Sequence, residues 1–359
     1  MNPDVTAPWS HPDAAPADDL ARAAADAPRA YQAATAPTPP QRSMDLLWSY
    51  VYLRNLDLPK FLDSLAPPQV RFFADSGAHS ARTLGLDISV EQYGEWLLKH
   101  RDWCTIYANL DVIGGPDATR QNQDYLESLG LQPMPVFHTG EPFSVLEDYI
   151  TDGYTYIALG KLLGNSQKDL TPWIARCFEV AGDRAVFHGF GLTVWDQLKR
   201  WPWYSVDSSS WVAGVRYGTI RLFDRGRWVQ IALRDRKAVA ANIDLLRSYR
   251  LSPRDMTSGH YNRSAVAGAS AVACYRAAEW LAARRPPPAL PAGKGYPPPD
   301  APHPTKIVRL QPEPTGMATT YLANTASTNH TALTMYLADS SNKWTNLAGQ
   351  GIVKEQAAQ

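Results

Sequence analysis

Short apolar runs alternate along this chain with longer segments in which apolar residues recur at spacings of three and four. The runs have the length and composition of buried strands. They cover residues 46–53, 70–75, 104–113, 133–138, 154–160, 185–191, 204–208, 219–223 and 228–233. The segments with helical spacing cover residues 89–100, 118–130, 142–153, 170–182, 192–201 and 264–285.

This alternation of strands and helices predicts an α/β fold. Strands that are apolar throughout are typical of parallel sheets whose two faces are both covered. About eight such units in roughly 200 to 250 residues favour a (β/α)8 TIM-like barrel, and an open doubly wound sheet is the alternative architecture. Because the Asp-Arg-Gly turn at 224–226 joins the last two runs as a hairpin, the barrel is expected to close irregularly.

Changes in composition divide the chain into four parts. Residues 1–43 are rich in Ala, Pro and Asp and are expected to form a disordered tail, because such a segment buries little apolar surface. Residues 44–285 hold the strand and helix patterns and form the expected catalytic barrel. The proline-dense residues 286–304 are interpreted as an extended linker. Residues 305–359 are interpreted as a C-terminal tail or a small appendage.

Composition and charge narrow the class of protein. The chain is 45% hydrophobic, with 12 Trp and 17 Tyr, which is enough for a large core. Lys and Arg balance Asp and Glu at 35 each, so contact with nucleic acid would depend on a local basic patch. Cys104, Cys177 and Cys274 lie far apart and match neither a disulfide framework nor a zinc knuckle, which favours a reducing cytoplasm. No apolar run approaches the roughly 20 residues of a membrane span, and no signal peptide is visible.

Polar residues follow the predicted strands at the ends where a barrel gathers its chemistry. They are Asp75, Asp111, His138, Gly160, His188 and Asp207. Taken singly, an aspartate at a strand end is commonly a helix cap or a turn brace, and a lone histidine is commonly a core imidazole. Taken together, three carboxylates in one mouth would repel one another unless a ligand or a chemical task holds them there.

The types of these residues suit exchange at a sugar carbon. One of two facing carboxylates can act as the nucleophile while the other handles protons. A third can accept hydrogen bonds from the N–H groups of a purine-like base. Metal binding by His138, His188 and an aspartate is an alternative, because these are ordinary ligands for zinc or iron. Neither histidine belongs to an HxH or HExxH arrangement, so the base-binding interpretation is preferred.

Four stretches between about residue 70 and residue 211 resemble, in order, the motifs of tRNA-guanine transglycosylases. FADSGAHSA resembles the family's DSGGFQ signature, ALGKLLG its GGLAVGE loop, VFHGFG its YLMGVG strand, and YSVDSSSW the strand with its nucleophilic aspartate. The diverged motifs and the leading run at 46–53 are more similar to the phage and bacterial branch that inserts 7-deazaguanine bases into DNA. The resemblance implies an enzyme that exchanges guanine in DNA for a 7-deazaguanine, such as 7-cyano-7-deazaguanine, without a cofactor.

The resemblance also implies a role for each matching residue. Asp207 would be the nucleophile that attacks C1′ of the nucleoside, and Asp75 would be the general acid and base. His79 and His188 stand where the family places the two side chains that sandwich the base, and Lys161 replaces a glycine of the loop. The residues implied in binding the base are Asp111, His138, Gly160, Leu162, His79, His188, Ser76 and Gly77.

The family's structural zinc set is missing, because Cys274 is the only cysteine after Asp207. No zinc subdomain or other metal site is therefore expected, and the helix at 264–285 is expected to pack across the barrel in its place. DNA phosphates would be held by basic residues near the mouth of the barrel. The candidates are Arg216, Arg234, Arg236, Lys237 and Arg263.

Other functions stay open on the sequence alone. The substrate could be tRNA rather than DNA, or the chain could be a catalytically silent barrel that binds nucleic acid or accompanies a virion. An unrelated barrel hydrolase, such as a glycosidase, is a further alternative. Asp75 and Asp207 distinguish an enzyme from a binder, because a binder would tolerate Asn at both positions. The protein is expected in the cytoplasm, the host's if a phage encodes it, and the need for helper proteins that open the duplex is left open.

Overall fold

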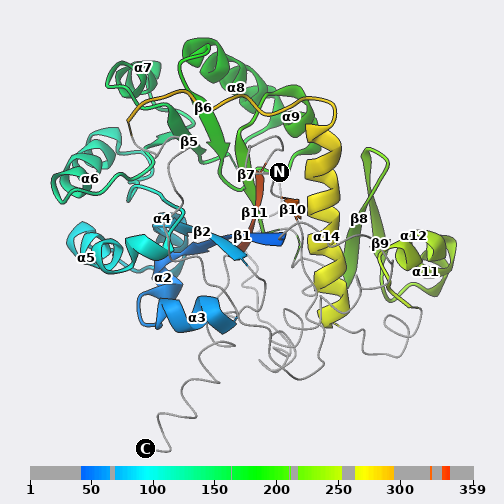
Figure 1. Cartoon of the computed structure of the whole chain (residues 1–359). Coiled ribbons are helices and arrows are strands. Elements are labelled where there is room, and N and C mark those ends of the chain that lie inside the picture. Colours follow the sequence, from blue (N-terminus) through cyan, green and yellow to red (C-terminus); the bar gives the residue numbers. More distant parts are fainter. Residues whose placement is uncertain are drawn as a thin grey trace, which may run out of the picture.

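The computed structural model describes residues 42–64, 69–162, 164–209, 211, 217–252, 263–294, 324–325 and 334–339. Within them the chain has an α/β fold, in which a mainly parallel sheet is surrounded by helices (Figure 1). The strands are β1 (Arg42–Ser49), β2 (Gln69–Asp75), β3 (Ile106–Tyr107), β4 (Val136–His138), β5 (Tyr156–Gly160), β6 (Val186–Gly189), β7 (Ser205–Ser208), β8 (Thr219–Asp224), β9 (Arg227–Ala232), β10 (Asn324–Thr325) and β11 (Thr334–Asp339). The helices are α2 (Tyr50–Leu53), α3 (Leu58–Ser64), α4 (Ala78–Leu84), α5 (Val90–His100), the 3-10 helix η2 (Arg101–Trp103), α6 (Pro116–Ser128), α7 (Phe143–Thr151), α8 (Gln167–Ala181), α9 (Trp195–Arg200), α11 (Arg236–Ala241), α12 (Ile243–Ser248) and α14 (Arg263–Ala282).

The main sheet brings together strands from both ends of the described chain. Its order is β3-β2-β1-β11-β7-β6-β5-β4, and every neighbouring pair along this path is parallel. β10 pairs with β1 in the antiparallel sense. An isolated parallel bridge between Ala108 and Met134 joins the chain after β3 to the chain before β4. Because the path is parallel, the carboxyl ends of these strands lie along one edge of the sheet, which we call the carboxyl edge.

The strands bury side chains on both faces, which explains their unbroken apolar runs. On β2, Phe73 belongs to an inner cluster, whereas Phe72 and Ala74 belong to the larger cluster that includes the helices. This alternation follows from the two-residue period of a strand. The inner cluster contains residues of six strands, namely Leu47, Phe73, Ile106, Val136, Tyr156 and Val186.

A separate antiparallel hairpin lies beside the main sheet, as the turn at 224–226 predicted. β8 pairs with β9 from Thr219 opposite Ala232 to Asp224 opposite Arg227. The two turn residues, Arg225 and Gly226, both have positive φ, which is the geometry that lets a tight turn follow the twist of the strands. The hairpin continues into α11 and α12.

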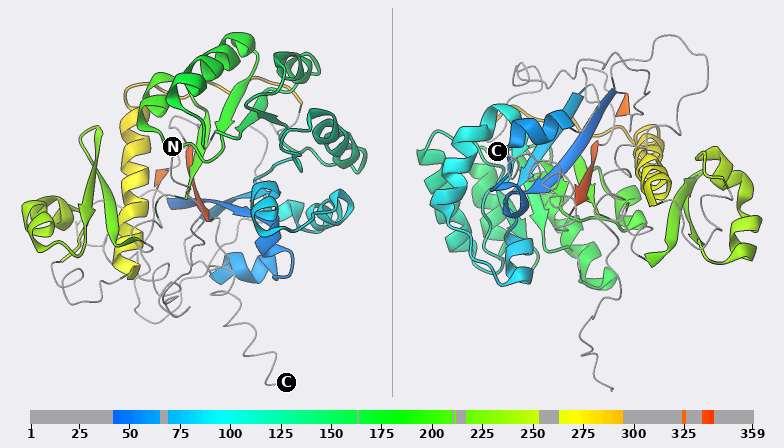
Figure 2. Two further views of the ribbon diagram at one scale, coloured as in Figure 1. Left: turned by 180° about the vertical axis from the view of Figure 1, so that it is seen from behind. Right: turned by 90° about the horizontal axis from the view of Figure 1, so that it is seen from below.

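Helix α14 stands between the main sheet and the hairpin, as Figures 1 and 2 show from three directions. It contacts both β8 and β11. At Gly226 an added Cβ would lie 2.5 Å from the ring of Trp280, so only glycine permits this close approach of the turn to α14. Among the described helices, none is both long and apolar enough to cross a membrane.

The structure tests the expectations about the start of the chain only in part. Residues 1–41 of the expected tail lie outside the described residues. The run at 46–53 was expected to be one strand, but the strand ends at Ser49 and Tyr50–Leu53 is a helical turn. All residues of this turn are buried, and an apolar run that is buried throughout does not distinguish a strand from a helix.

The structure also differs from the expected linker and tail at the end of the chain. Residues 305–359 were interpreted as a tail or an appendage, yet they contribute β11, which pairs between β1 and β7 in the main sheet. In the segment 286–294, expected to be linker, Leu290 is buried in the inner cluster. Lys294 Nζ lies 2.6 Å from Glu127 Oε2, so this part of the segment is fastened to α6.

Candidate active site

The carboxyl edge of the main sheet holds the polar residues that the sequence places at the strand ends. Asp75 ends β2, His138 ends β4, and Gly160 ends β5. His188 and Asp207 lie on β6 and β7, and Asp111 follows β3 in the connection to α6. We call these six residues the carboxyl-edge cluster.

The surroundings of Asp75 strongly perturb its carboxyl group. Asp75 is opposite Ser49 in the β1–β2 register, and Ser49 Oγ donates a hydrogen bond of 2.5 Å to Asp75 Oδ2. Burial is the main reason that the pKa of Asp75 is raised from 3.8 to about 7. The charges of Asp111 and Asp207 raise the pKa as well, whereas the hydrogen bonds from Ser49 and the Gly77 N–H lower it. Asp75 can therefore gain or lose a proton near neutral pH.

The turn after Asp75 depends on glycine. Gly77 has φ 81°, a left-handed conformation, and precedes the first residue of α4. An added Cβ would lie 2.6 Å from Val51 Cγ2, so a larger residue would push the turn away from α2. Ser76 is fully buried in the same turn, and its hydroxyl donates to Asp111 Oδ1 at 3.3 Å. The turn therefore links Asp75 to Asp111.

Asp111 and Glu141 hold the ring of His138 from both sides. His138 Nε2 lies 2.8 Å from Asp111 Oδ2, and His138 Nδ1 lies 2.9 Å from Glu141 Oε1. The backbone N–H of His138 also donates to Glu141 Oε2 at 2.9 Å. Burial lowers the pKa of His138, but the hydrogen bonds and charges of Asp111 and Glu141 outweigh it and raise the pKa to about 9. At neutral pH this histidine is a cation between two carboxylates.

Gly160 lets the ring of His138 approach β5 closely. Gly160 is opposite His138 in the β4–β5 register, and an added Cβ would lie 2.6 Å from His138 Cδ2. The conformation of Gly160 is not left-handed, so glycine is required here for space. Lys161, the next residue, has φ 55° and is exposed.

Asp207 lies at the end of a second hydrogen-bonded group. Its Oδ1 accepts a 2.6 Å hydrogen bond from the Gly191 N–H and lies 3.4 Å from His188 Nε2. His188 Nδ1 lies 2.6 Å from Ser205 Oγ, which also contacts the hydroxyl of Tyr156. Burial lowers the pKa of His188 and the charge of Asp207 offsets this only in part, so the ring is neutral at neutral pH. If Tyr156 donates to Ser205 and Ser205 to His188, the remaining ring N–H faces Asp207.

Leu162, His79 and His188 were also predicted to bind the base, and their exposure to solvent differs. Leu162 is buried directly after β5, and His79 is exposed on the first turn of α4. His188, expected to stack on a base, is fully buried between Phe73 and Phe190, with ring centroids 5.0 and 4.8 Å away. In this arrangement its contacts are with the core and with Asp207.

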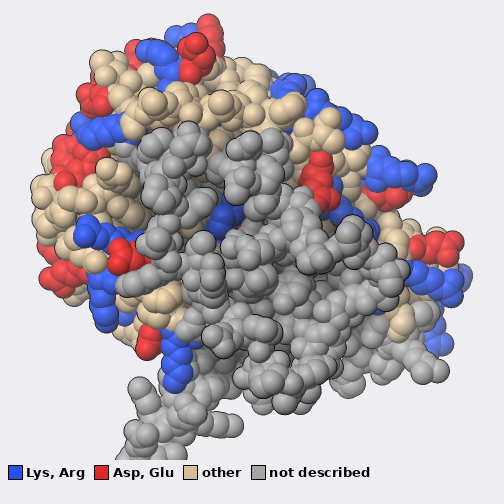
Figure 3. Space-filling view, in the orientation of Figure 1, with Lys and Arg blue, Asp and Glu red and all other residues tan. Residues whose placement is uncertain are grey.

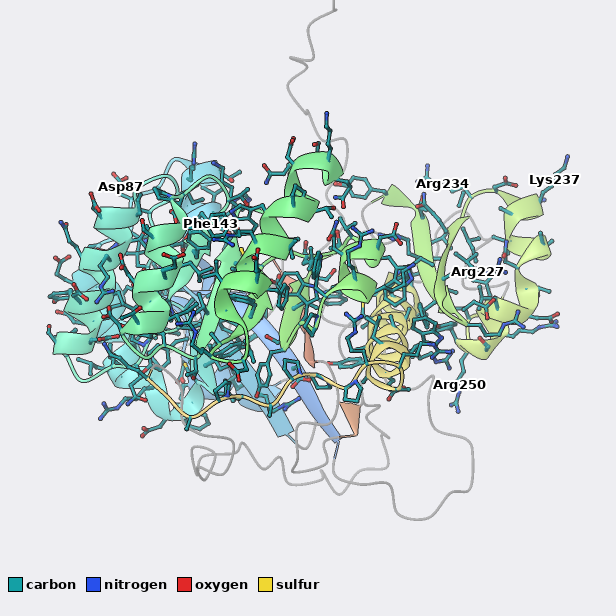
Figure 4. The ribbon with its side chains drawn as sticks, turned by 90° about the horizontal axis from the view of Figure 1, so that it is seen from above. Asp87, Phe143, Arg227, Arg234, Lys237 and Arg250 are labelled. Carbon is teal, nitrogen blue, oxygen red and sulfur yellow. The ribbon has the colours of Figure 1, made fainter. Side chains whose placement is uncertain are left out.

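The predicted phosphate-binding residues divide into two groups. Arg234, Arg236 and Lys237 are exposed at the start of α11, where the Asp235 carboxylate caps the helix. Figure 4 shows Arg234, Lys237 and Arg250 on the hairpin side of the molecule, with Phe143 of α7 on the other side. Arg216 lies outside the described residues, and Arg263 begins α14 with a side chain that the structure does not describe.

The partners of the cluster were not predicted from the sequence. They are Ser49, Glu141, Tyr156, Gly191 and Ser205. Glu141 had a visible signal, since it is a carboxylate three residues after a strand-ending histidine. Ser49 became recognisable only once the β1–β2 register placed it opposite Asp75. Within the described residues, no group of three His, Cys, Asp or Glu is arranged to hold a metal ion.

Comparisons with known proteins do not assign a family. The chain matches no protein-family model, and no curated protein matches it.

Proposed function

We propose that this protein is a transglycosylase that exchanges guanine in DNA for a 7-deazaguanine base such as 7-cyano-7-deazaguanine. The observation that carries the proposal is the interaction of three carboxylates, from β2, from β7 and from the connection after β3, in which the charges of Asp111 and Asp207 act on Asp75. One of them titrates near neutral pH, as an acid that must give and take a proton requires. The resemblance to the tRNA-guanine transglycosylases assigns this chemistry to the same aspartates.

The proposed architecture is a (β/α)8 barrel in which β11 is the eighth strand. Three observations support it. The parallel path β3-β2-β1-β11-β7-β6-β5-β4 has eight strands, and the Ala108–Met134 bridge joins its two ends. Residues from six of these strands share one inner cluster, as the side chains inside a small barrel do. In such a barrel the carboxyl-edge cluster surrounds the mouth.

In the first half of the proposed reaction, guanine leaves the sugar. A carboxylate oxygen of Asp207 attacks C1′ and forms a C1′–O bond, while the C1′–N9 bond breaks and its electron pair goes to guanine. Protonated Asp75 gives its proton to the departing base and becomes a carboxylate. The hydrogen bond from the Gly191 N–H orients the Asp207 carboxylate for this attack.

In the second half, the incoming base restores the nucleoside. N9–H of the deazaguanine gives its proton to the Asp75 carboxylate, and N9 attacks C1′ as the C1′–O bond breaks and returns its electron pair to Asp207. Asp75 is then protonated and Asp207 ionised, as at the start. A pKa of about 7 suits Asp75 to both steps, because neither protonation state is strongly favoured.

Recognition of the base is assigned to Asp111 and the neighbouring backbone. Asp111 keeps 13% of its side chain exposed, while one oxygen faces His138 and the other accepts from Ser76. Carboxylate oxygens have further lone pairs that can accept N–H groups of a guanine-like base. Binding of the DNA phosphates is assigned to the exposed cations Arg234, Arg236 and Lys237.

Incorporation of labelled guanine into DNA by the purified full chain tests the proposal. Single-stranded and duplex oligonucleotides are both used, because flipping a paired base costs a few kcal/mol. Wild type is expected to incorporate label, and Asp207→Asn is expected to abolish incorporation. Asp196→Asn, an aspartate on α9 with an 81% exposed side chain, is the matched control and is expected to behave as wild type.

The outcomes distinguish the alternatives. Label that appears in tRNA but not in DNA would show that tRNA is the substrate. Release of base without uptake of label would indicate hydrolysis. Full incorporation of label by Asp207→Asn would show that Asp207 is not the nucleophile. Absence of incorporation by wild type into both DNA forms and into tRNA would overturn the proposal.

A further inference from the structure

The contacts of His138 define a group of residues that the sequence motifs do not contain. Both ring nitrogens and the backbone N–H of His138 face carboxylate oxygens at 2.8 to 2.9 Å. Glu141 supplies two of these three contacts, one oxygen to the ring and one to the backbone. Its side chain is 5% exposed and that of His138 is 2% exposed, so water competes little for these bonds.

Counting protons gives the charge of this group. An ionised carboxylate only accepts hydrogen bonds, so each ring nitrogen that faces one must carry a proton. A neutral imidazole has one N–H and would place a nitrogen lone pair against a carboxylate oxygen. The arrangement Asp111–His138–Glu141 is therefore satisfied when the ring carries both protons and a positive charge between two negative ones.

From this geometry we infer that Glu141 is a positioning residue, which holds His138 as a doubly protonated ring so that His138 in turn fixes the Asp111 side chain as a hydrogen-bond acceptor for the base. The inference rests on the proposed function for the identity of the base, but not for the state of the ring. It assigns His138 to the support of Asp111 rather than to direct contact with the base through its ring nitrogens.

The surroundings of the ring are consistent with this role. Asp111 faces it from the connection after β3, Glu141 from the turn after β4, and Gly160 from β5. Asp75 lies near enough to Asp111 for their charges to interact, and Tyr149 on α7 interacts with Glu141. The two direct carboxylate partners raise the pKa of His138 to about 9 against the effect of burial.

The first test follows the ring itself in the full-length protein. Imidazole nitrogen chemical shifts at about pH 7.5 are expected to show both nitrogens of His138 protonated, with His138→Asn used to assign the signals. In Glu141→Gln the amide keeps the shape but loses the charge, so the pKa of His138 is expected to fall by about one unit or more. Glu147→Gln, an exposed position on α7, is the matched control and is expected to leave it unchanged.

The second test follows the reaction. Glu141→Gln is expected to raise KM for the free base about tenfold at neutral pH with kcat within about twofold, because ground-state binding by Asp111 is weakened. In this variant KM for the free base is expected to rise further as the pH is raised past the lowered pKa of His138. A purely structural role for Glu141 would lower thermal stability without moving this pH dependence.

The results that overturn the inference are separate from those that overturn the function. A neutral His138 in wild type, which needs no variant, or an unchanged pKa in Glu141→Gln would overturn it. Normal base exchange by Glu141→Gln with an unchanged KM and pH profile would also overturn it and leave the proposed function standing. If wild type exchanges no base, the proposed function fails while the nitrogen shifts still test the state of the ring.

Discussion

At the scale of single residues, Asp75 makes the stability of the fold depend on pH. Its pKa is raised from 3.8 to about 7, chiefly by burial, so the folded protein favours the protonated form. A raised carboxyl pKa gives stability that is fully present below about pH 4 and is lost as the pH rises through about 7. Asp75→Asn removes the ionisable group. Its stability relative to wild type should increase between about pH 5 and about pH 8, by about 2.5 kcal/mol.

Thermal or urea unfolding at several pH values measures this effect. Asp117→Asn, an exposed acid on the first turn of α6, is the control for removing one carboxylate. A constant difference between wild type and Asp75→Asn across the pH range would mean that Asp75 is not held in a strained ionised state at high pH.

The hydrogen bond from Ser49 gives a prediction about the pKa of Asp75. Its hydroxyl donates to Asp75 Oδ2 and lowers the pKa of that carboxyl. Ser49→Ala should raise the pKa of Asp75 above about 7 and move the pH profile of base exchange towards alkaline pH, with a loss of roughly 1 to 2 kcal/mol in stability. Thr83→Ala, which removes an exposed hydroxyl from α4, serves as the control. A profile that stays in place would show that Ser49 does not tune the acid.

At the scale of elements, the sequence predicted those parts whose signal is local. The strands that became β2, β4, β5, β6 and β7, the hairpin, and the helices α5 to α9 all follow from residue spacing within one segment. β11 was missed, because the run at 334–339 is short and lies among Thr, Ala, Asn and Ser. Its place in the sheet depends on pairing with strands over 100 residues away, and a short window carries no information on such pairing.

The same limit applies to the site. Asp75, Asp111, His138 and Asp207 could be found because each follows an apolar run. Ser205 acts through Tyr156 and His188, which belong to other strands, so its role requires the register of β5 to β7. Glu141 lies three residues after His138, and its spacing was a local signal that was not used. His188 was expected to stack on a base, and only the packing of Phe73 and Phe190 around it reveals its burial.

The central position of β11 gives a prediction for the main sheet. Tyr336 is opposite Asp207 in the β7–β11 register. Proline removes a ladder N–H and is tolerated in sheets only at edges, so Tyr336→Pro should lose about 3 kcal/mol or more relative to Tyr336→Ala, and base exchange should fall with it. Tyr336→Ala retains the backbone N–H and is the matched control. Equal unfolding free energies of the two variants would mean that β11 does not hold β1 and β7 together.

At the scale of the whole molecule, the balanced charge conceals a separation. Residues 219–251 contain eight Arg and Lys against three Asp and no Glu, although the chain as a whole has 35 of each sign. On the face shown in Figure 3, by contrast, acidic and basic side chains are interspersed around much of the rim. The carboxyl-edge cluster and Glu141 contribute four carboxyl groups, of which Asp75 titrates near neutral pH, and one cationic histidine, so the site itself does not attract phosphates. A polyanion could therefore be held only by cations outside the cluster.

This separation predicts how the salt dependence of DNA binding changes. Arg234, Arg236 and Lys237 are exposed at the start of α11, and phosphates that they neutralise would release counterions. Replacing all three by Ala should weaken DNA binding at low salt and reduce the slope of log K against log salt by about 2 to 3. Ala at Lys168, Arg176 and Arg184, exposed cations on or next to α8, makes the same change in net charge and should leave the slope unchanged. Equal salt slopes for the two triple variants would mean that DNA binding depends only on the net charge of the protein. A phosphate-binding site formed by Arg234, Arg236 and Lys237 would change its slope only when these three residues are replaced.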